Sequence, residues 1–379
     1  MSGRGLLARF VVVLAVVAAV GGCKQQASNE IVVGEFASLT GGTATFGRSS
    51  DAGVQLAVKE INDAGGLLGK KVRVVVEDDQ SKPEEARTAV LKLLKQDQVV
   101  AVLGEVASSR SLAAAPECQR SKIPMISPAS TNPKVTEVGD FIFRVCFIDP
   151  FQGSTMAKFA IESLHAKKAA ILRDIKNDYS VGLADFFRDE FVQEGGKILT
   201  DVSYSEGDID FKAQLTAIRA VSPEVVFVPG YYTEVGLIAR QARELGITVP
   251  LLGGDGWDSP KLWEIGGQAL NGCYFSNHYA ADDPNEVVQK FIGKFRAAYS
   301  EVPDAMAVLG YDSAQVLFDS IRRAGTADGV KLRDAIAKTK DFPGVSGKIT
   351  IDDKRNARKS IVVLKIEDGK IKFAQKVEP

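Results

Sequence analysis

Two loops rich in hydroxyl side chains each follow an expected β-strand. The first lies in "VLGEVASSRS", residues 102–111, where an apolar run ends and three serines precede a helix of small apolar residues. Capping of that helix explains one hydroxyl, from Ser108 or Ser109. The other hydroxyls, with free backbone N–H groups and the positive end of the helix, would form a receptor for an anionic oxygen such as that of a carboxylate.

The second loop is "SPASTNP", residues 127–133, in which Ser130 and Thr131 lie between prolines that stiffen the chain. A turn followed by a helix cap is the alternative interpretation. In open α/β sheets, however, ligands bind outside the carboxyl ends of the strands. Polar side chains at two neighbouring strand ends therefore favour a binding site.

Tyrosines and one acid follow expected strands in the second half of the chain. Tyr179 precedes a helix, Tyr231 follows the run "VVFVP", and Asp255 lies between glycines in "GGDGW". Such residues also pack at core edges or form turns. If the two halves of the chain face each other across a cleft, these groups and the hydroxyl loops together complement a zwitterion with an apolar side chain.

Patterns typical of catalytic sites are missing from the sequence. There is no G-x-S-x-G elbow and no G-x-G-x-x-G after the first strand, and "GGLLGKK" departs from the spacing of a phosphate-binding loop. The two histidines, His165 and His278, and the lack of a CxxC pair argue against a metal site. We expect His278 to be a core or hinge residue. The sequence predicts no enzyme activity, no metal and no cofactor.

Length and charge bound the class of protein. The chain has 379 residues, more than one hydrophobic core usually holds, which predicts two compact units. Its 47 basic and 48 acidic side chains give a formal net charge of −1, with no long block of one sign. This balance argues against a nucleic-acid-binding surface.

Short β-branched runs alternate with amphipathic stretches from Ile31 onwards, and the alternation restarts after Pro150. This pattern predicts an α/β fold of two doubly wound lobes with parallel sheets. After Asp283, two expected helices with no strand between them must pack on an existing sheet. The last segment predicts a hairpin with Asp368 and Gly369 at its turn.

The N-terminal segment has the layout of an export signal. Arginines precede the apolar stretch 10–20, and small residues lead to Cys23. The pattern resembles a bacterial lipoprotein signal, in which Cys23 becomes the lipidated first residue. A plain signal peptide or a short membrane anchor is the alternative. We assign residues 1–22 to the signal peptide and 23–30 to a lipid-anchored tether, which places the protein in the periplasm or, with a single membrane, at the cell surface.

The remaining cysteines are Cys118, Cys146 and Cys273. Export permits a disulfide, but an odd number leaves at least one thiol over, and the spacing does not say which. Burial as small apolar residues is the alternative.

From Ile31 to Pro379 the chain resembles the periplasmic leucine/isoleucine/valine-binding proteins, the solute receptors of branched-chain amino acid ABC importers. The segments that carry the resemblance are "LTGGTATFG", "INDAGGLLGKKVRVVVEDDQSKPEEA", "PMISPASTNPKVT", "GYYTEVGLIARQARELG" and "GGDGW". The resemblance implies a periplasmic binding protein type I fold, with three crossovers near Phe147, His278 and Val345. Residues 31–147 and 279–345 would form the first lobe, and 148–278 and 346–379 the second, with ligand capture by hinge closure.

The resemblance also implies roles for individual residues. The ligand carboxylate would be held by Ser108, Ser109 and Thr131. The ammonium would be held by Ala129, Thr131 and Asp255, the last standing where the best-known members have glutamate. The side-chain pocket would be formed by Phe46, Tyr179, Tyr231 and Met306. The family's disulfide would join positions 81 and 107, which are serine and alanine here, so we expect that bridge to be absent.

The sequence thus predicts a monomeric, lipid-anchored receptor that captures an α-amino acid, in particular leucine, isoleucine or valine, for a membrane ABC permease. Two alternatives keep this fold, a sensory ligand-binding module and a receptor for amides or other small carboxylates. An enzyme on a doubly wound fold is a third alternative, and it would require a cofactor.

Overall fold

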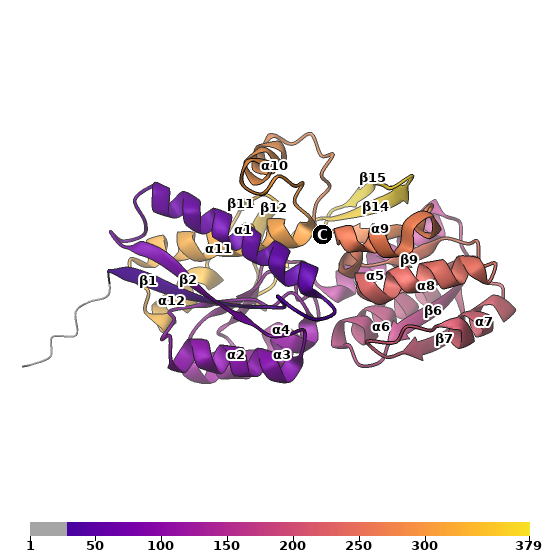
Figure 1. Ribbon diagram of the computed structural model, residues 1–379, viewed down its shortest axis with the longest axis horizontal. Helices are drawn as coiled ribbons and strands as arrows, with labels where there is room; N and C mark the ends of the chain where they lie inside the picture. Colours follow the sequence, from indigo (N-terminus) through magenta and orange to yellow (C-terminus); the bar gives the residue numbers. More distant parts are fainter. Residues whose placement is uncertain (1–28) are drawn as a thin grey trace, which may run out of the picture.

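A computed structural model describes residues 29–379, which form two α/β lobes side by side (Figure 1). The expected export signal, the lipidation residue Cys23 and most of the tether lie outside the described residues. Lipid attachment therefore stays a prediction. Among residues 29–379, no helix combines the length and hydrophobicity needed to cross a bilayer.

The first lobe is built on a parallel sheet in the order β2-β1-β3-β4-β5. Its strands are β1 (Glu30–Ala37), β2 (Lys71–Asp78), β3 (Val102–Leu103), β4 (Met125–Ser127) and β5 (Ile142–Arg144). The helices between them are α1 (Ala44–Asp63), α2 (Pro83–Lys95), α3 (Ser108–Ser121) and α4 (Lys134–Glu137). In α1, the apolar residues that recur at helical spacing are buried, so this periodicity directs one face of the helix onto the sheet.

Three helices return to the first lobe after the chain has built most of the second: α10 (Glu286–Tyr299), α11 (Ala305–Ala324) and α12 (Gly329–Ala337). Helix α11 packs directly against α1, and glycines permit the close approach. A Cβ on Gly53 would lie 2.0 Å from the Ala307 carbonyl oxygen, and one on Gly310 would lie 2.3 Å from that of Ser50. The expectation that these helices pack on an existing unit is confirmed.

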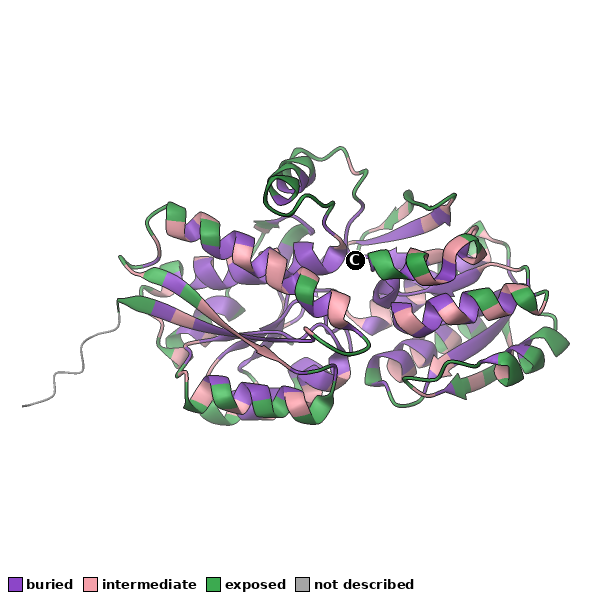
Figure 2. Ribbon diagram, viewed as in Figure 1, coloured by how far each residue is buried: buried purple, intermediate pink, exposed green. Residues whose placement is uncertain are grey.

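The second lobe is built on a sheet in the order β15-β14-β10-β9-β8-β6-β7. Its parallel strands are β6 (Lys168–Asp174), β7 (Lys197–Tyr204), β8 (Val225–Phe227), β9 (Leu251–Gly253) and β10 (Tyr274–Asn277). Its helical segments are α5 (Asp149–Lys158), η1 (Phe159–Ser163), α6 (Asp178–Gln193), α7 (Lys212–Ala220), α8 (Tyr232–Glu244), η2 (Asp255–Trp257), α9 (Pro260–Gly266) and η3 (Gly267–Leu270). Figure 2 shows that the central strands of both sheets are largely buried, whereas the edge strands β2 and β7 are mostly intermediate or exposed.

Strands β14 (Ile361–Glu367) and β15 (Lys370–Val377) add an antiparallel hairpin to the edge of this sheet. Asp368 and Gly369 form its turn with φ of 49° and 74°, the left-handed geometry that two-residue hairpin loops favour. The predicted hairpin is therefore confirmed.

The third crossover lies later than expected. A small sheet of β11 (Phe342–Gly344), β12 (Gly347–Ile351) and β13 (Ala357–Arg358) stays with the first lobe, where Arg144 N donates to the Arg355 carbonyl oxygen at 3.2 Å. The next strand, β14, belongs to the second lobe. The chain thus crosses at Lys359 and Ser360 rather than near Val345, because residues 342–358 form their own antiparallel unit.

The three described cysteines, Cys118, Cys146 and Cys273, are all buried and free. The interpretation of these residues as small apolar core residues therefore holds, and no disulfide joins them.

Candidate functional site

Hydrogen bonds between side chains of opposite lobes hold the lobes together over their shared interface. The Ser109 hydroxyl donates to Asp178 Oδ2 and accepts from the Asp178 backbone N–H, both at 2.9 Å. Asn132 Nδ2 donates to the Asp178 carbonyl oxygen at 2.8 Å. Thr45 Oγ1 and Ser259 Oγ lie 2.8 Å apart. The structure is therefore the closed arrangement, in which any site between the lobes is screened from water.

The two hydroxyl-rich loops of the first lobe meet at Ser108. This residue begins α3 but does not cap it, because Ala107 takes the cap position in an extended conformation. Instead, the buried Ser108 hydroxyl accepts a hydrogen bond from Asn132 N at 3.2 Å. The capping interpretation is wrong, and the hydroxyl ties the start of α3 to the neighbouring loop.

Thr131 and Ala129 lie buried in this second loop. The Thr131 carbonyl oxygen accepts from Asp149 N at 3.0 Å, which fastens the loop to the start of α5. The Thr131 hydroxyl makes no hydrogen bond of normal geometry within residues 29–379, although it lies close enough to the Asp149 carboxyl to lower the pKa of that group. Buried polar atoms are nearly always well paired, so a poorly paired buried hydroxyl at a lobe interface is available to a ligand.

Arg144 fixes the backbone of this loop, a role that the sequence interpretation missed. Its guanidinium is buried and donates to the carbonyl oxygens of Ser130 and Asn132. The signal was present in "FIFRVCF", a charged side chain in the middle of an otherwise apolar strand. Within residues 29–379 this guanidinium has no ion-pair partner, and the loop carbonyl groups accept from its terminal nitrogens instead.

On the second lobe, Asp255 is buried and both of its carboxylate oxygens are held. Oδ1 accepts from Gln152 Nε2 at 2.8 Å, and Oδ2 lies 3.0 Å from His278 Nε2. The His278 ring stacks on Phe147 with centroids 3.8 Å apart, at the second crossover, where a core or hinge residue was expected. Burial lowers the pKa of His278 to about 4, so at neutral pH it donates to Asp255 as a neutral imidazole. Asp255 therefore has no cationic partner among residues 29–379.

This buried histidine makes folding sensitive to acid. The ordinary histidine pKa is about 6.5 and the folded value is about 4, so between these values the unfolded chain binds a proton that the folded chain does not. The contribution is fully present above pH 6.5 and is lost as the pH falls. The wild-type protein should lose unfolding free energy when the pH falls from 7 to 5. We expect this loss to be about 2 kcal/mol smaller in His278→Gln.

Urea unfolding at both pH values measures this difference. The matched control is His165→Gln, at the exposed histidine, which should keep the wild-type dependence. A pH dependence that is the same in His278→Gln and the wild type would contradict the prediction.

A second buried acid, Asp149, lies at the start of α5 and was also missed. Neither of its carboxyl oxygens makes a hydrogen bond of normal geometry within the described chain. Burial raises the pKa of Asp149 to about 8, and the charge of Asp255 adds to this increase. At neutral pH the Asp149 carboxyl is therefore largely protonated, and a bound cation would favour its ionisation by lowering this pKa.

Aromatic rings from both lobes pack together next to these polar groups. Phe46, on α1, meets Tyr231 edge-on with centroids 5.4 Å apart, and Tyr231 stacks on Tyr179 at 5.4 Å. The Tyr179 hydroxyl accepts from Gly256 N at 3.2 Å, which joins the rings to the Asp255 segment. Met306 is buried at the start of α11 in the same apolar cluster. The structure thus brings the predicted aromatic residues together, with Met306 less directly placed.

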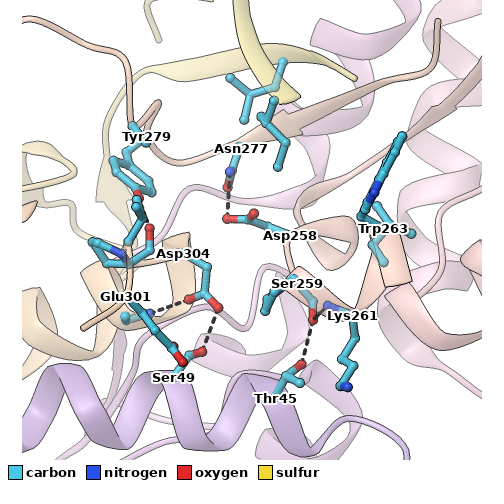
Figure 3. Close-up of a pocket in the computed structure, with 18 of the residues that line it drawn as sticks. Thr45, Ser49, Asp258, Ser259, Lys261, Trp263, Asn277, Tyr279, Glu301 and Asp304 are labelled. Atoms are coloured by element: carbon cyan, nitrogen blue, oxygen red, sulfur yellow. Dashed lines mark hydrogen bonds between the residues drawn. The ribbon is translucent and has the colours of Figure 1, made fainter. Parts of the chain in front are cut away.

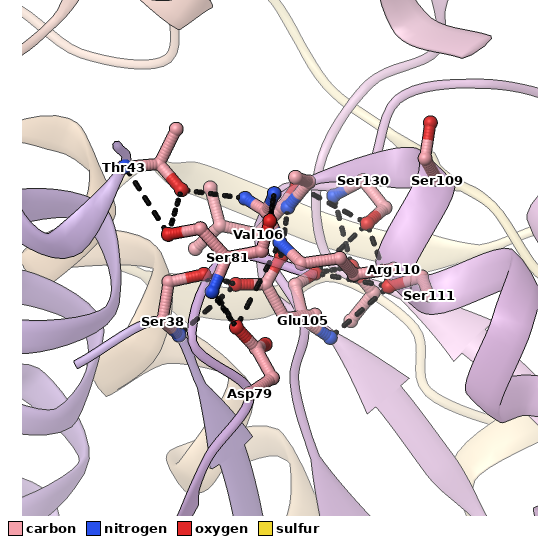
Figure 4. Close-up of polar contacts among 12 residues, drawn as sticks. Ser38, Thr43, Asp79, Ser81, Glu105, Val106, Ser109, Arg110, Ser111 and Ser130 are labelled. Carbon is pink, nitrogen blue, oxygen red and sulfur yellow. Dashed lines mark hydrogen bonds and ion pairs between the residues drawn. The ribbon is translucent and has the colours of Figure 1, made fainter. Parts of the chain in front are cut away.

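A buried polar network supports the start of α3 from below (Figure 4). Arg110 Nε lies 3.1 Å from Glu105 Oε2, and its Nη2 donates to Thr43 Oγ1 at 2.8 Å. Glu105 also accepts from Ala107 N, at the cap of the helix. Burial and the charge of Glu105 raise the pKa of Asp79, 3.9 Å from Arg110, to about 8. The network orients the helix start that faces the second lobe.

The expected absence of a bridge between positions 81 and 107 agrees with this network. Ser81 Oγ lies 3.0 Å from Thr43 Oγ1, and the Ala107 N–H is bound by Glu105. Arg110 Nη1 donates to the Ser81 carbonyl oxygen at 3.3 Å, so a polar contact joins these loops where the resemblance placed a disulfide.

Residues 30–370 match the sequence profile described as periplasmic binding protein. The chain belongs to the periplasmic binding protein family. It is 32% identical over 349 residues to the Leu/Ile/Val-binding protein BraC3 of Rhizobium johnstonii, covering 91% of this chain and 94% of that protein. The resemblance inferred from the sequence is confirmed.

Solved structures of this periplasmic binding protein family share the fold. A leucine-binding protein of Thermotoga maritima has a TM-score of 0.89 and 42% identity, covering 92% of this chain and 99% of that one. A branched-chain amino acid transporter substrate-binding protein of Streptococcus pneumoniae, in complex with isoleucine, has a TM-score of 0.88 and 34% identity, covering 92% and 100%. Both agree with the two-lobed α/β fold predicted from the sequence.

A different kind of ligand occurs in another relative. A solute-binding protein of Rhodopseudomonas palustris, in complex with 3,4-dihydroxybenzoic acid, has a TM-score of 0.84 and 26% identity, covering 92% of this chain and 98% of that one. Members of the family are extracytoplasmic binding proteins of ABC transporters, not enzymes. Membership therefore fixes the class of activity, whereas the ligand depends on the residues of the site.

Proposed function

We propose that this periplasmic binding protein captures an α-amino acid between its lobes by hinge closure and delivers it to an ABC permease. Leucine, isoleucine and valine are the favoured ligands. One observation carries the proposal: a buried shell from both lobes holds the Thr131 hydroxyl without a hydrogen bond of normal geometry in the described chain and the Asp255 carboxylate without a cation. A zwitterionic ligand supplies a partner for each group, since its carboxylate can bind the Thr131 hydroxyl and its ammonium can pair with Asp255.

The carboxylate of the ligand binds at the start of α3 in this proposal. Ser108 and Ser109 form the first turn, where free N–H groups and the positive end of the helix favour an anion. Thr131 contributes its hydroxyl from the adjacent loop. Hydrogen bonds to a charged oxygen are about twice as strong as those between neutral groups.

The ammonium group binds to Asp255, the Ala129 carbonyl oxygen and Thr131. Asp255 is shorter than the family's glutamate, and Gln152 and His278 orient it from both sides. A ligand without an ammonium would leave this carboxylate buried and unpaired, which is costly. The charge of Asp255 therefore selects α-amino acids over amides and simple carboxylates.

The ligand side chain packs against Phe46, Tyr179, Tyr231 and Met306. Such a pocket discriminates between ligands that differ by a methylene by only about 1–3 kcal/mol. We therefore expect the polar shell to select the class of ligand and this apolar pocket to rank the members of the class.

Closure couples binding to delivery. The bonds from Ser109 to Asp178 and from Thr45 to Ser259 join opposite lobes, so they form only when the lobes meet. A ligand that bridges the lobes shifts the population toward this form, which a permease then recognises. In this proposal the protein acts as a monomer anchored through a lipid on Cys23, and the intact mass of the mature protein checks the anchor.

A thermal-shift screen against the standard amino acids tests the proposal. A ligand at 100 times its dissociation constant stabilises the folded state by about 2.7 kcal/mol. We expect an increase in melting temperature with leucine, isoleucine or valine and none with leucinol, which lacks the carboxylate. No shift with any α-amino acid would overturn the proposal.

A receptor for aromatic carboxylates is the second candidate, because tyrosine rings surround the site and a relative holds 3,4-dihydroxybenzoic acid. The screen therefore includes benzoate and 3,4-dihydroxybenzoate. A shift with these ligands and none with amino acids would favour the second candidate, since neither ligand pairs with Asp255.

A further inference from the structure

A cavity of about 870 Å³ is lined by residues of both lobes, several of which are drawn in Figure 3. The first lobe contributes Thr45 and Ser49 from α1, together with the residues before α11. The second lobe contributes the start of α9 and the β14–β15 hairpin. None of the residues proposed to hold the amino acid lines this cavity. Its volume falls in the range of about 300–1,000 Å³ that is typical of small-molecule sites.

Two carboxylates from opposite lobes lie on the cavity wall without a cation. Asp258 is buried, and its Oδ2 accepts from Asn277 Nδ2 at 2.9 Å and Ala305 N at 2.7 Å. Asp304 Oδ2 accepts from the Ser49 hydroxyl at 2.6 Å. Within residues 29–379, neither acid has an ion-pair partner. Burial, together with the charge of Asp258, raises the pKa of Asp304 to about 7, as expected for a buried acid that has a second acid nearby and no cation.

The remaining charges of the lining do not neutralise these acids. Five acidic and two basic side chains line the cavity. Of the basic ones, Lys261 is paired with Glu264, and Arg48 Nε donates to the Leu39 carbonyl oxygen at 3.0 Å. The cavity therefore carries an excess of negative charge.

The rest of the lining is apolar and rich in aromatic rings. The side chains include Trp263, Tyr279, Phe295, Tyr299, Leu364 and Ile366. Aromatic faces attract organic cations, and aliphatic walls accept the apolar part of a ligand. Its acidic side chains disfavour an anion as the ligand. A metal ion does not fit either, because no group of acids, histidines or cysteines in the described chain could hold one.

We propose that this cavity binds an organic cation with an apolar body, such as an arylalkyl amine. The ammonium group faces Asp258 and Asp304, and the apolar body packs against Trp263 and Leu364. Because the two acids belong to opposite lobes, the bound cation links the lobes in the closed form. Occupancy of the cavity and closure on an amino acid therefore reinforce each other.

Calorimetric titration of phenethylamine into the mature protein tests the proposal, with 2-phenylethanol as the uncharged probe. We expect the amine to bind at least about tenfold more tightly than the alcohol, and Asp258→Asn and Asp304→Asn each to weaken the amine by about tenfold or more. Asparagine keeps an acceptor for Asn277 in one variant and the α11 cap in the other, so both should fold. The matched control Asp63→Asn, at an exposed acid of α1 that does not line the cavity, should bind as the wild type does.

Two further titrations separate this cavity from the amino-acid site. Saturating leucine should strengthen amine binding, and Asp255→Asn should lose leucine binding while it keeps the amine. Displacement of the amine by leucine, equal affinity for the alcohol, or no amine binding at millimolar concentration would overturn the second site. Failure of the wild type to bind any α-amino acid would count against the proposed function and not against the cavity.

Discussion

We expect the Asp255→Asn protein to bind leucine roughly 30- to 5,000-fold more weakly than the wild type, because losing one partner of a buried charge pair costs about 2–5 kcal/mol. Isothermal titration calorimetry measures the change. Folding should be unaffected. The asparagine oxygen still accepts from Gln152, and the neutral His278 ring can shift its proton to Nδ1, which has no partner within the described residues, and accept at Nε2.

The control for this variant is Asp189→Asn, which removes an exposed carboxylate on α6. It should leave leucine affinity within about twofold, as expected for a screened surface charge. A leucine affinity of Asp255→Asn equal to that of the control would remove Asp255 from the ammonium site. A variant that loses leucine but gains benzoate would instead favour the receptor for aromatic carboxylates.

The fold could be predicted because its helices, strands and turns are determined largely by residues that are close together in the sequence. In α1, Val54, Ala57, Val58 and Ile61 recur at helical spacing and are buried together, so periodicity alone identified the inward face. The Asp368-Gly369 turn was predictable for the same reason, since its left-handed geometry favours these residues. Strict alternation of strands and helices then implied parallel sheets.

The third crossover was placed wrongly because it depends on contacts that are distant in sequence. The segment 342–358 pairs with itself and then binds the first lobe through Thr136 Oγ1 and Asn356 Oδ1, 3.0 Å apart. Lys359 is buried beside Ser346 of the same unit, to which its ammonium donates. The hydrophobic periodicity of a strand indicates which of its faces is buried, but it does not indicate which lobe the strand joins.

The candidate site was predictable in its loops but not in its supporting residues. Ser108, Thr131 and Asp255 stand at strand ends, where parallel sheets place their ligands. Gln152 and His278, by contrast, come from the crossovers, and Gln152 is 103 residues away from the Asp255 that it orients. Likewise, the Ser108 hydroxyl was assigned to a helix cap because sequence cannot show that Glu105 already holds the first N–H group.

The network under α3 should make the largest single contribution to stability among the polar contacts considered. We expect Arg110→Met to lower the free energy of unfolding by about 3–5 kcal/mol, because it leaves Glu105 buried without its cation. Urea unfolding measures the loss. The matched control is Arg120→Met on the same helix, where the arginine is exposed and its partner Glu117 keeps a second ion pair with Arg87, so the loss should be less than about 1 kcal/mol.

A double-mutant cycle separates a buried ion pair from simple packing. If the charge of Glu105 causes the penalty, Glu105→Gln should offset part of the loss in Arg110→Met, so the double variant is more stable than the sum of the single losses predicts. Additive losses would assign the effect of Arg110 to its packing. If Arg110→Met lowers the free energy of unfolding no more than Arg120→Met does, the buried network does not make the proposed contribution to stability. Because Glu105 also holds Ala107 N at the helix cap, a misplaced α3 should weaken leucine binding even where folding survives.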